Sequence, residues 1–302
     1  MKYSYFPGCS LKATGRAYEE SFLSLCKALD MEMEELENWN CCGATSFMSV
    51  EMGAAYALTI RNLAIAEKAG LDMVAPCGGC YGILLKADHY YKKYPTVHES
   101  AVKSLKTEGL EYKGTVRVRH PLDVLASDLP PRALRSKVKK PLKGLKVACY
   151  YGCRFVRPIA PFDDMHNPET MDLLLKTVGA RIVDYTMKGK CCGGAMSGAM
   201  PNVAQEMTYL ILRAAERAEA DVVATACPLC QFNLEAYQDE IRAAHPDLKP
   251  IPVVYFTQLL GVALGLDATA TALNRQIVPV EPILREKGIL ADEKKQPATA
   301  GV

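Results

Sequence analysis

The fold of this chain is decided by residues 41–80, which read CCGATSFMSVEMGAAYALTIRNLAIAEKAGLDMVAPCGGC, and by the return of their cysteine frame at residues 191–230. Four cysteine positions recur 150 residues later, with no insertion or deletion between them. A repeat at constant spacing indicates an internal duplication. The repeated positions are Cys41, Cys42, Cys77 and Cys80 in the first copy and Cys191, Cys192, Cys227 and Cys230 in the second.

A fifth cysteine precedes each frame. Cys9, in the segment FPGC, corresponds to Cys153, in the segment YYGC, with 31 residues before the first vicinal pair and 37 before the second. Each half therefore reads C-x(31 or 37)-C-C-G-x33-C-x-x-C. Cys26 and Cys149 fall outside the pattern, and we interpret both as small buried hydrophobes, because free cysteine is among the most buried residue types.

Strand-like segments run into the cysteines, and segments with apolar residues at helical spacing follow them. Strands that alternate with helices imply a largely parallel sheet with helices on both faces. We therefore predict an α/β fold with two pseudo-symmetric cysteine-rich domains, each a mostly parallel sheet flanked by helices. In such sheets ligands bind outside the carboxyl ends of the strands, where most of these cysteines fall. The predicted strands are Lys2–Phe6, Met73–Ala75, Leu145–Tyr150 and Val222–Ala226, and the predicted helices include Tyr18–Leu29, Tyr56–Ala69, Glu169–Val178 and Ala204–Ala218.

The chain divides into four predicted segments. Residues 1–130 form the first domain and residues 145–280 the second. Residues 131–144 are the linker, because prolines and basic residues gather there, and we interpret their charges as a solvated face. Residues 281–302 are a charged tail with little apolar periodicity, which either frays or docks on a partner.

Composition limits the protein class. The chain has 302 residues, 49% of them hydrophobic and 23% charged, with a net charge of +2, as in an ordinary soluble globular protein. No run approaches the roughly 18 apolar residues of a membrane span, and the start of the chain lacks the regions of a secretory signal. We expect a cytoplasmic protein with no membrane span and no nucleic-acid partner. Because a cytoplasm keeps thiols reduced, clustered cysteines there indicate metal ligands rather than disulfides.

Five thiols per site restrict the metal group. A closed zinc site takes four ligands, whereas each set here has five, two of them neighbours in sequence. Vicinal cysteines reach separate irons of a cluster more easily than one small ion. A thioredoxin-like C-x-x-C pair would leave the other three cysteines unexplained. We therefore predict an iron–sulfur cluster in each half, and the spacing leaves open a cubane with one spare cysteine or a cluster that uses all five.

Glycines stand beside the predicted ligands. A missing side chain lets the backbone approach a bulky cofactor and directs N–H groups at sulfur. Cys80 and Cys230 are predicted to begin helices, whose N-terminal dipole favours thiolate over thiol. The glycines are Gly43, Gly78, Gly79, Gly193 and Gly194.

The duplicated pattern resembles the cysteine-rich CCG domain, and the whole chain is similar to the family of the B subunit of the soluble heterodisulfide reductases of methanogenic archaea. The likeness rests on both cysteine frames and on the segments PGCSLKATGRAYEES at 7–21 and HNPETMDLLLKTVGA at 166–180. It covers nearly the full chain. The second copy departs by having Tyr151 where the first has Pro7, and by six more residues in its first spacer.

The resemblance implies a disulfide oxidoreductase that reduces the mixed disulfide of coenzyme M and coenzyme B to its two thiols. Two non-cubane [4Fe-4S] clusters would face one sulfur each across a shared cleft, so that neither half of the substrate leaves as a radical. By the same resemblance one cluster would be held by Cys9, Cys41, Cys42, Cys77 and Cys80, and the other by Cys153, Cys191, Cys192, Cys227 and Cys230.

Partners are also implied by the resemblance. They are the ferredoxin-like subunit of heterodisulfide reductase, the flavin-bearing subunit that feeds it and, in a larger assembly, a hydrogenase or formate dehydrogenase. The alternative is an electron-relay protein like the cysteine-rich subunits of lactate, glycolate or succinate-type dehydrogenases. Many of those carry the ferredoxin run C-x2-C-x2-C-x3-C-P, and this sequence has none, which favours the terminal, substrate-reducing function.

A few polar residues receive more limited predictions. His120 follows a strand-like segment and aligns with Tyr255 of the second half. We interpret it as a core or capping histidine. The functional alternative is a histidine that donates a proton to a leaving thiolate. Cations follow the first cysteine of each copy and could neutralise the sulfonate and phosphate of the coenzymes, balance the clusters, or lie in solvent. These cations are Lys12, Arg16, Arg154 and Arg157.

Overall fold

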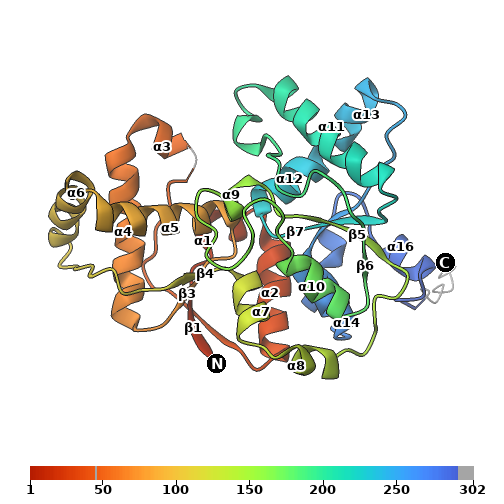
Figure 1. The fold of residues 1–302 in the computed structure, drawn as a ribbon, viewed down its shortest axis with the longest axis horizontal. Coiled ribbons are helices and arrows are strands. Elements are labelled where there is room, and N and C mark those ends of the chain that lie inside the picture. The colour runs from red at the N-terminus through yellow and green to blue at the C-terminus, as the bar shows by residue number, and fades with distance from the viewer. Residues whose placement is uncertain (45, 292–302) are drawn as a thin grey trace, which may run out of the picture.

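The computed structural model describes residues 1–44 and 46–291, and it contains two four-stranded sheets in which every paired strand is parallel. The strands are β1 (Lys2–Tyr5), β2 (Glu32–Glu35), β3 (Met73–Val74), β4 (Val118–Arg119), β5 (Lys146–Tyr150), β6 (Arg181–Ile182), β7 (Val222–Thr225) and β8 (Val253–Tyr255). The first sheet has the order β2-β1-β3-β4 and the second the order β6-β5-β7-β8 (Figure 1). The same order in both sheets confirms the predicted α/β class with two copies of one architecture.

Helices flank both sheets, and the four predicted helices are found as α2, α4, α10 and α11. Those of the first half are α1 (Gly8–Leu11), α2 (Arg16–Ala28), α3 (Ser46–Val50), α4 (Met52–Ala69), α5 (Gly78–Lys93), α6 (Pro95–Lys106), α7 (Pro121–Ser127) and α8 (Pro131–Ser136). Those of the second half are α9 (Cys153–Val156), α10 (Thr170–Thr177), α11 (Pro201–Arg217), α12 (Pro228–Ala236), α13 (Gln238–Ala244), α14 (Phe256–Ala263), α15 (Ala268–Thr271) and α16 (Glu281–Glu286), with the 3-10 turns η1 (Gly194–Met196) and η2 (Leu273–Arg275).

Local sequence signals fix where the long helices begin and end. The carboxylate of Glu51 accepts two backbone N–H bonds at the start of α4, and Gly70, with a φ of 70°, ends it in the left-handed conformation. Pro201 and Pro228 begin α11 and α12. Proline suits the first turn of a helix, because a backbone N–H there has no partner within the helix.

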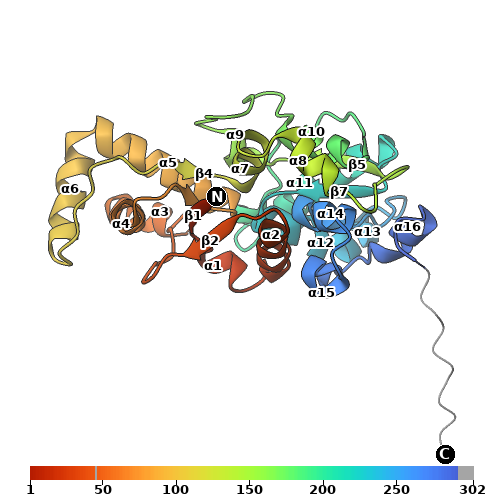
Figure 2. The same cartoon turned by 90° about the horizontal axis from the view of Figure 1, so that it is seen from below.

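Each half packs a helix against the other half. Helix α14, which follows β8, lies on α2 of the first half, and α7, which follows β4, lies on α10 of the second half (Figures 1 and 2). Between α2 and α14 the hydroxyls of Ser21 and Thr257 are 2.7 Å apart and buried. Phe22 of the first half and Leu259 of the second belong to the same hydrophobic core. One core therefore runs through both halves, and a second cluster of buried residues lies within the second half.

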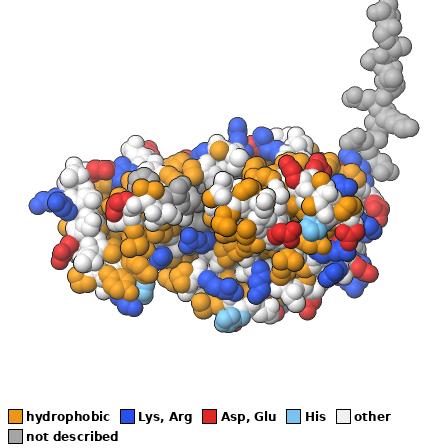
Figure 3. Space-filling model, turned by 90° about the horizontal axis from the view of Figure 1, so that it is seen from above, with side chains coloured by type: hydrophobic (Ala, Val, Ile, Leu, Met, Phe, Trp, Pro, Cys, Tyr) orange, Lys and Arg blue, Asp and Glu red, His pale blue; other side chains and the backbone are white. Residues whose placement is uncertain are grey.

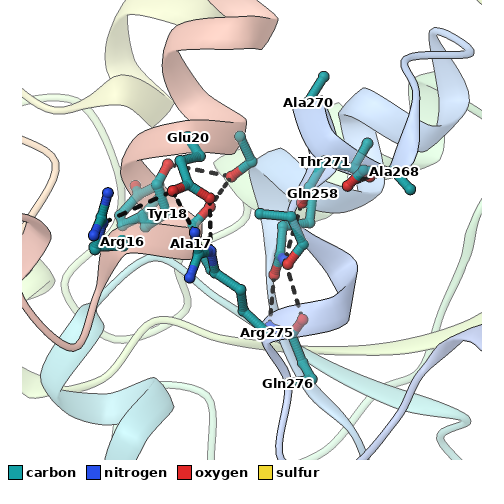
Figure 4. Close-up of polar contacts among 12 residues, drawn as sticks. Arg16, Ala17, Tyr18, Glu20, Gln258, Ala268, Ala270, Thr271, Arg275 and Gln276 are labelled. Atoms are coloured by element: carbon teal, nitrogen blue, oxygen red, sulfur yellow. Dashed lines mark hydrogen bonds and ion pairs between the residues drawn. The ribbon is translucent and has the colours of Figure 1, made fainter.

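Polar contacts at the surface reinforce this pairing of α2 with the second half (Figure 4). Arg275 donates two hydrogen bonds of 2.7 Å to the carboxylate of Glu20, which also lies 3.8 Å from Arg16. The amide of Gln258 donates to the carbonyl of Thr271 at 3.1 Å and so holds α15 beside α14. The exposed ion pairs contribute at most about 1 kcal/mol each, so the buried core carries most of the stability.

The predicted linker and part of the predicted tail are folded onto the molecule. Within residues 131–144, α8 buries Leu134, and the N–H groups of Lys139 and Lys140 donate to the carbonyl of Ala263 at 2.9 Å each. In the tail, α16 buries Leu284, and residues 292–302 lie outside the described residues. The segment limits themselves stay predictions. Over residues 1–44 and 46–291, no helix is both long enough and apolar enough to cross a membrane.

Candidate metal centre

The ten repeated cysteines lie in loops or first helical turns near the carboxyl ends of the strands. Cys9 follows β1 and Cys77 follows β3, and Cys153 and Cys227 take the same places after β5 and β7. Cys77 and Cys227 cap the N-termini of α5 and α12, so the second cysteine of each C-x-x-C pair lies in the first turn of a helix. This is where a parallel sheet binds its ligands.

In each half the thiols approach one another. The spacing of these sulfurs is too wide for a disulfide and close enough for several of them to contact one bound group. Among the described residues, no three Cys, His, Asp or Glu side chains surround the position of a single ion. The Sγ–Sγ distances are 3.7 Å between Cys9 and Cys41, 3.1 Å between Cys42 and Cys80, and 3.6 Å between Cys192 and Cys230.

The two remaining cysteines lie in the hydrophobic core. Cys26 is on α2 and Cys149 is inside β5, with at most 1% of either residue exposed. Burial raises the pKa of both thiols, which keeps them protonated and unreactive. The interpretation of both as small buried hydrophobes is confirmed.

A glycine makes room for a ligand sulfur at the same place in each half. Gly8 and Gly152 have φ values of 66° and 72°, a region that favours glycine. A Cβ on Gly8 would lie 2.8 Å from the sulfur of Cys80, and a Cβ on Gly152 would lie 3.0 Å from the sulfur of Cys230. Any larger residue would therefore displace a candidate ligand.

Backbone N–H groups point at sulfur behind the vicinal pair. Gly193 donates to the sulfur of Cys191 at 3.3 Å, and Gly194 donates to that of Cys192 at 3.4 Å. The pKa of Cys191 is lowered to about 6, chiefly by a hydrogen bond from Cys153 and also by the Gly193 N–H group and the charge of Arg154. These groups favour thiolate, the form that binds metal.

The carbonyl group of the second vicinal cysteine is anchored in both halves. Thr59, on α4, donates its hydroxyl to the carbonyl of Cys42 at 2.8 Å. In the second half Thr208, on α11, and Asn233, on α12, donate to the carbonyl of Cys192 at 3.2 and 2.7 Å. Buried partners of this kind fix the orientation of ligand loops.

The two cysteine sets lie next to each other. Gly78, which directly follows Cys77 of the first set, lies against Cys227 of the second, because a Cβ on Gly78 would lie 3.6 Å from the sulfur of Cys227. A Cβ on Gly78 would lie 3.4 Å from the Cβ of Cys227, so the backbone of one set packs against a side chain of the other. The two sets are therefore adjacent, and their expected placement at one shared cleft stays a prediction.

A small cavity of about 80 Å³ opens at the second set. Its walls include Cys153, Arg154 and Cys191 of the second half and Gly78 and Gly79 of the first. The space exceeds the ~30 Å³ share of one water in the liquid. It can therefore receive a small group, and the first half closes one side of it.

His120 is a buried capping residue in this structure. Its Nδ1 accepts the N–H of Leu122 at 3.1 Å at the start of α7, and its Nε2 lies 2.9 Å from the carbonyl of Pro76. Burial lowers its pKa to about 4, so the ring is neutral near pH 7. The capping interpretation is confirmed, and a ring with both nitrogens engaged is poorly placed to donate a proton to substrate.

The four predicted cations are placed differently. Arg154 lines the cavity. Lys12 instead forms ion pairs with Glu19 at 2.7 Å and Glu35 at 2.8 Å, and Arg16 lies beside Glu20 on α2. The fourth cation, Arg157, is exposed on the loop that follows α9. The structure thus brings one of the four to the cysteines.

A buried polar network supports the second set and was missed by sequence reasoning. The hydroxyl of Tyr151 donates to Asp172 at 2.9 Å, and Lys188 forms an ion pair with the same carboxylate at 2.6 Å. The carbonyl of Lys188 accepts the N–H groups of Tyr151 and Gly152 at 2.9 and 3.1 Å. The sequence difference that could have indicated this network is Tyr151, which takes the place that Pro7 has in the first half, because proline cannot form these hydrogen bonds.

Comparison with known proteins agrees with the duplicated site. The family model of the cysteine-rich domain, CCG, matches residues 3–84 and 147–235, once in each half. A solved structure of a hypothetical protein from Helicobacter pylori superposes with a TM-score of 0.74 at 11% identity. That superposition covers 92% of this chain and 52% of the other, so the chain spans about half of that protein, and the likeness concerns the fold alone.

Curated relatives are subunits of redox complexes. The chain is 33% identical over 280 residues to the 8-methylmenaquinol:fumarate reductase membrane anchor subunit of Wolinella succinogenes, covering 92% of this chain and 97% of that protein. It is 32% identical over 282 residues to the B subunit of the ferredoxin/F420H2-dependent CoB-CoM heterodisulfide reductase of Methanosarcina acetivorans, covering 92% and 94%. A protein of Archaeoglobus profundus, described as like the B subunit of heterodisulfide reductase, is 30% identical, covering 90% and 93%.

Proposed function

This chain belongs to the family of cysteine-rich CCG-domain proteins, and we propose that it is the iron–sulfur subunit that reduces the mixed disulfide of coenzyme M and coenzyme B to its two thiols. The observation that most supports this function is the packing of the C-x-x-C loop of the first set against Cys227 of the second, through Gly78. Reducing a disulfide takes two electrons and two protons and yields two thiols. Two adjacent redox sites suit a substrate with two adjacent sulfurs.

Each cysteine set fits a cluster by several independent features. Its thiols gather without room for a bulky residue at Gly8 or Gly152, and N–H groups point at sulfur. We assign a non-cubane [4Fe-4S] cluster to each set, because the family resemblance implies this type and each set offers five thiols where a cubane takes four. When bound, the clusters supply the two electrons. The ligands would be Cys9, Cys41, Cys42, Cys77 and Cys80 for one, and Cys153, Cys191, Cys192, Cys227 and Cys230 for the other.

The chain's own residues would bind and orient the substrate. Arg154 lines the cavity and offers a charged, planar donor to a sulfonate or phosphate group. Phe155 and Leu229 form apolar walls of the same cavity, which limits water beside the reacting sulfurs. Arg154 is itself exposed, so water and salt screen part of its attraction for an anion. Lys12 and Arg16 remain weaker candidates, because both already face carboxylates.

A relay function is the second candidate. It is favoured by the 33% identity to a membrane anchor subunit of a fumarate reductase over 92% of this chain. In that function the clusters would pass electrons onward to another protein, and the cavity would hold no disulfide substrate.

Membership of a larger complex is supported by the relatives and by the surface. Figure 3 views the molecule from the side of α3 and α11 and shows hydrophobic side chains exposed among lysines and arginines. Val50, Met200 and Leu229 are 80%, 53% and 36% exposed. We propose that a ferredoxin-like subunit, itself fed by a flavin-bearing subunit, docks near the clusters in the cytoplasm. In a larger assembly a hydrogenase or formate dehydrogenase would supply the electrons.

The decisive assay is heterodisulfide reduction by the anaerobically prepared full chain with an artificial one-electron donor. We expect two thiols per disulfide consumed, loss of activity in Cys192→Ser, and no loss in the matched control Cys26→Ser. Intact cluster spectra without thiol release would instead establish the relay function.

A further inference from the structure

Two buried tyrosines, one from each half, stack against each other beside the cysteine sets. Tyr18 lies on α2 and Tyr255 ends β8, with ring centroids 4.6 Å apart and planes within 10°. At most 1% of either residue is exposed. The pair therefore spans the seam between the two halves.

Both tyrosines are positioned close to the C-x-x-C loop of the second half. Tyr255 pairs in register with Thr225, which lies two residues before Cys227. Gly15, which precedes α2, packs tightly against Pro228, because a Cβ on Gly15 would lie 2.9 Å from the Cβ of that proline. Tyr18 is one turn further along α2. These two contacts place both rings beside the C-x-x-C loop of the second half.

The two hydroxyl groups differ in their partners. Tyr255 donates to the side-chain carbonyl of Gln231 at 3.3 Å, and Gln231 in turn donates to Glu235 at 2.6 Å. Among the described residues, none accepts or donates a hydrogen bond at the hydroxyl of Tyr18. A buried hydroxyl without a partner costs free energy, so it indicates a missing acceptor. Burial also raises the pKa of Tyr18 well above its ordinary value, which keeps the group a donor.

We infer that the hydroxyl of Tyr18 donates a hydrogen bond to a sulfide of the group that the cysteines at the boundary of the two sites would hold. Tyr255, fixed by Gln231, holds the ring of Tyr18 in place by stacking. Hydrogen bonds to sulfur stabilise the more negative, reduced state of a cluster and raise its reduction potential. Tyr18 would thus tune the potential of one site from the other half of the chain. This inference rests on the proposed iron–sulfur sites.

The test is Tyr18→Phe in the full chain, reconstituted anaerobically with iron and sulfide, with Tyr91→Phe as the matched control. Tyr91 is also a buried tyrosine, but its hydroxyl donates to the carbonyl of Tyr112 at 2.7 Å, at the far end of α5. We expect unchanged iron content in both variants and a more negative midpoint potential in Tyr18→Phe alone. Pulsed ENDOR should also lose an exchangeable proton near the reduced cluster in that variant.

Two results would overturn the inference, and only the first of them would also exclude the proposed function. A wild-type chain that takes up no iron removes the proposed function together with the inference. If the wild-type chain binds normal clusters, and its midpoint potentials and exchangeable protons match those of Tyr18→Phe, the inference is wrong but the proposed function stands. If Tyr18→Phe fails to fold, the exchangeable proton is sought in the wild-type chain before and after transfer to deuterium oxide, and its absence has the same meaning.

Discussion

Replacing Gly152 by alanine should damage the second metal site while leaving the fold intact. Gly152 has a φ of 72° and a ψ of −178°, a backbone conformation essentially confined to glycine, which costs an alanine roughly 1–3 kcal/mol. The new Cβ would also lie 3.0 Å from the sulfur of Cys230, closer than ordinary van der Waals contact. A cysteine can relieve that contact by rotating its side chain, but the rotation moves its sulfur away from Cys192, now 3.6 Å distant. The loss is small against the roughly 5–15 kcal/mol stability of a native domain, so the effect should fall on the metal.

The assay compares Gly152→Ala with Gly198→Ala, a glycine whose Cβ would meet nothing within 4 Å. We expect both variants to remain folded in urea titrations, with Gly152→Ala destabilised by about 1–3 kcal/mol. We expect iron to fall to about half in Gly152→Ala and to stay at the wild-type level in Gly198→Ala. Full iron occupancy and an unchanged cluster spectrum in Gly152→Ala would refute the reasoning that Gly152 makes room for the ligand sulfur.

Two further predictions follow from the same geometry. Cys42→Ser and Cys192→Ser should each abolish the spectrum of their own cluster and leave the other present, as measured by anaerobic EPR, and unchanged spectra would assign these cysteines a non-ligand function. Glu235 should weaken the fold as pH rises, because burial raises its pKa from 4.5 to about 7. The folded chain holds this proton more tightly than the unfolded chain, so the protonated carboxyl group adds up to about 3 kcal/mol to the free energy of unfolding. This stabilisation is complete below about pH 4.5 and is lost as the pH rises through about 7. Urea titrations at pH 5 and pH 8.5 should show a smaller decrease in Glu235→Gln than in wild type, and an equal decrease in the two proteins would contradict the assignment.

The cysteine frame predicted the architecture because parallel strands direct their carboxyl ends to one edge. The constant offset of four cysteines required the two halves to share strand order, and β1, β3, β5 and β7 were predicted from the apolar segments before each cysteine. The strands β2, β6 and β8 escaped prediction: β2 is mostly charged, β6 has two residues and β8 has three. Periodicity carries little signal over such lengths.

Contacts between the halves could not be predicted from either half alone. Nothing local in α14 indicates that it packs on α2, and the resulting shared core hides any boundary between domains. The ion pair of Lys12 with Glu35 depends on the pairing of β2 with β1, which brings Glu35 beside it. The stack of Tyr18 on Tyr255 likewise joins residues more than two hundred positions apart, a separation that no pattern in the sequence reveals.

The most direct test of the central claim is iron and acid-labile sulfide analysis of the anaerobically isolated chain, with EPR of the same sample. Two four-iron sites predict about eight irons and eight sulfides per chain, with zinc absent. Stoichiometric zinc, or a chain that holds neither metal after reconstitution, would contradict the account.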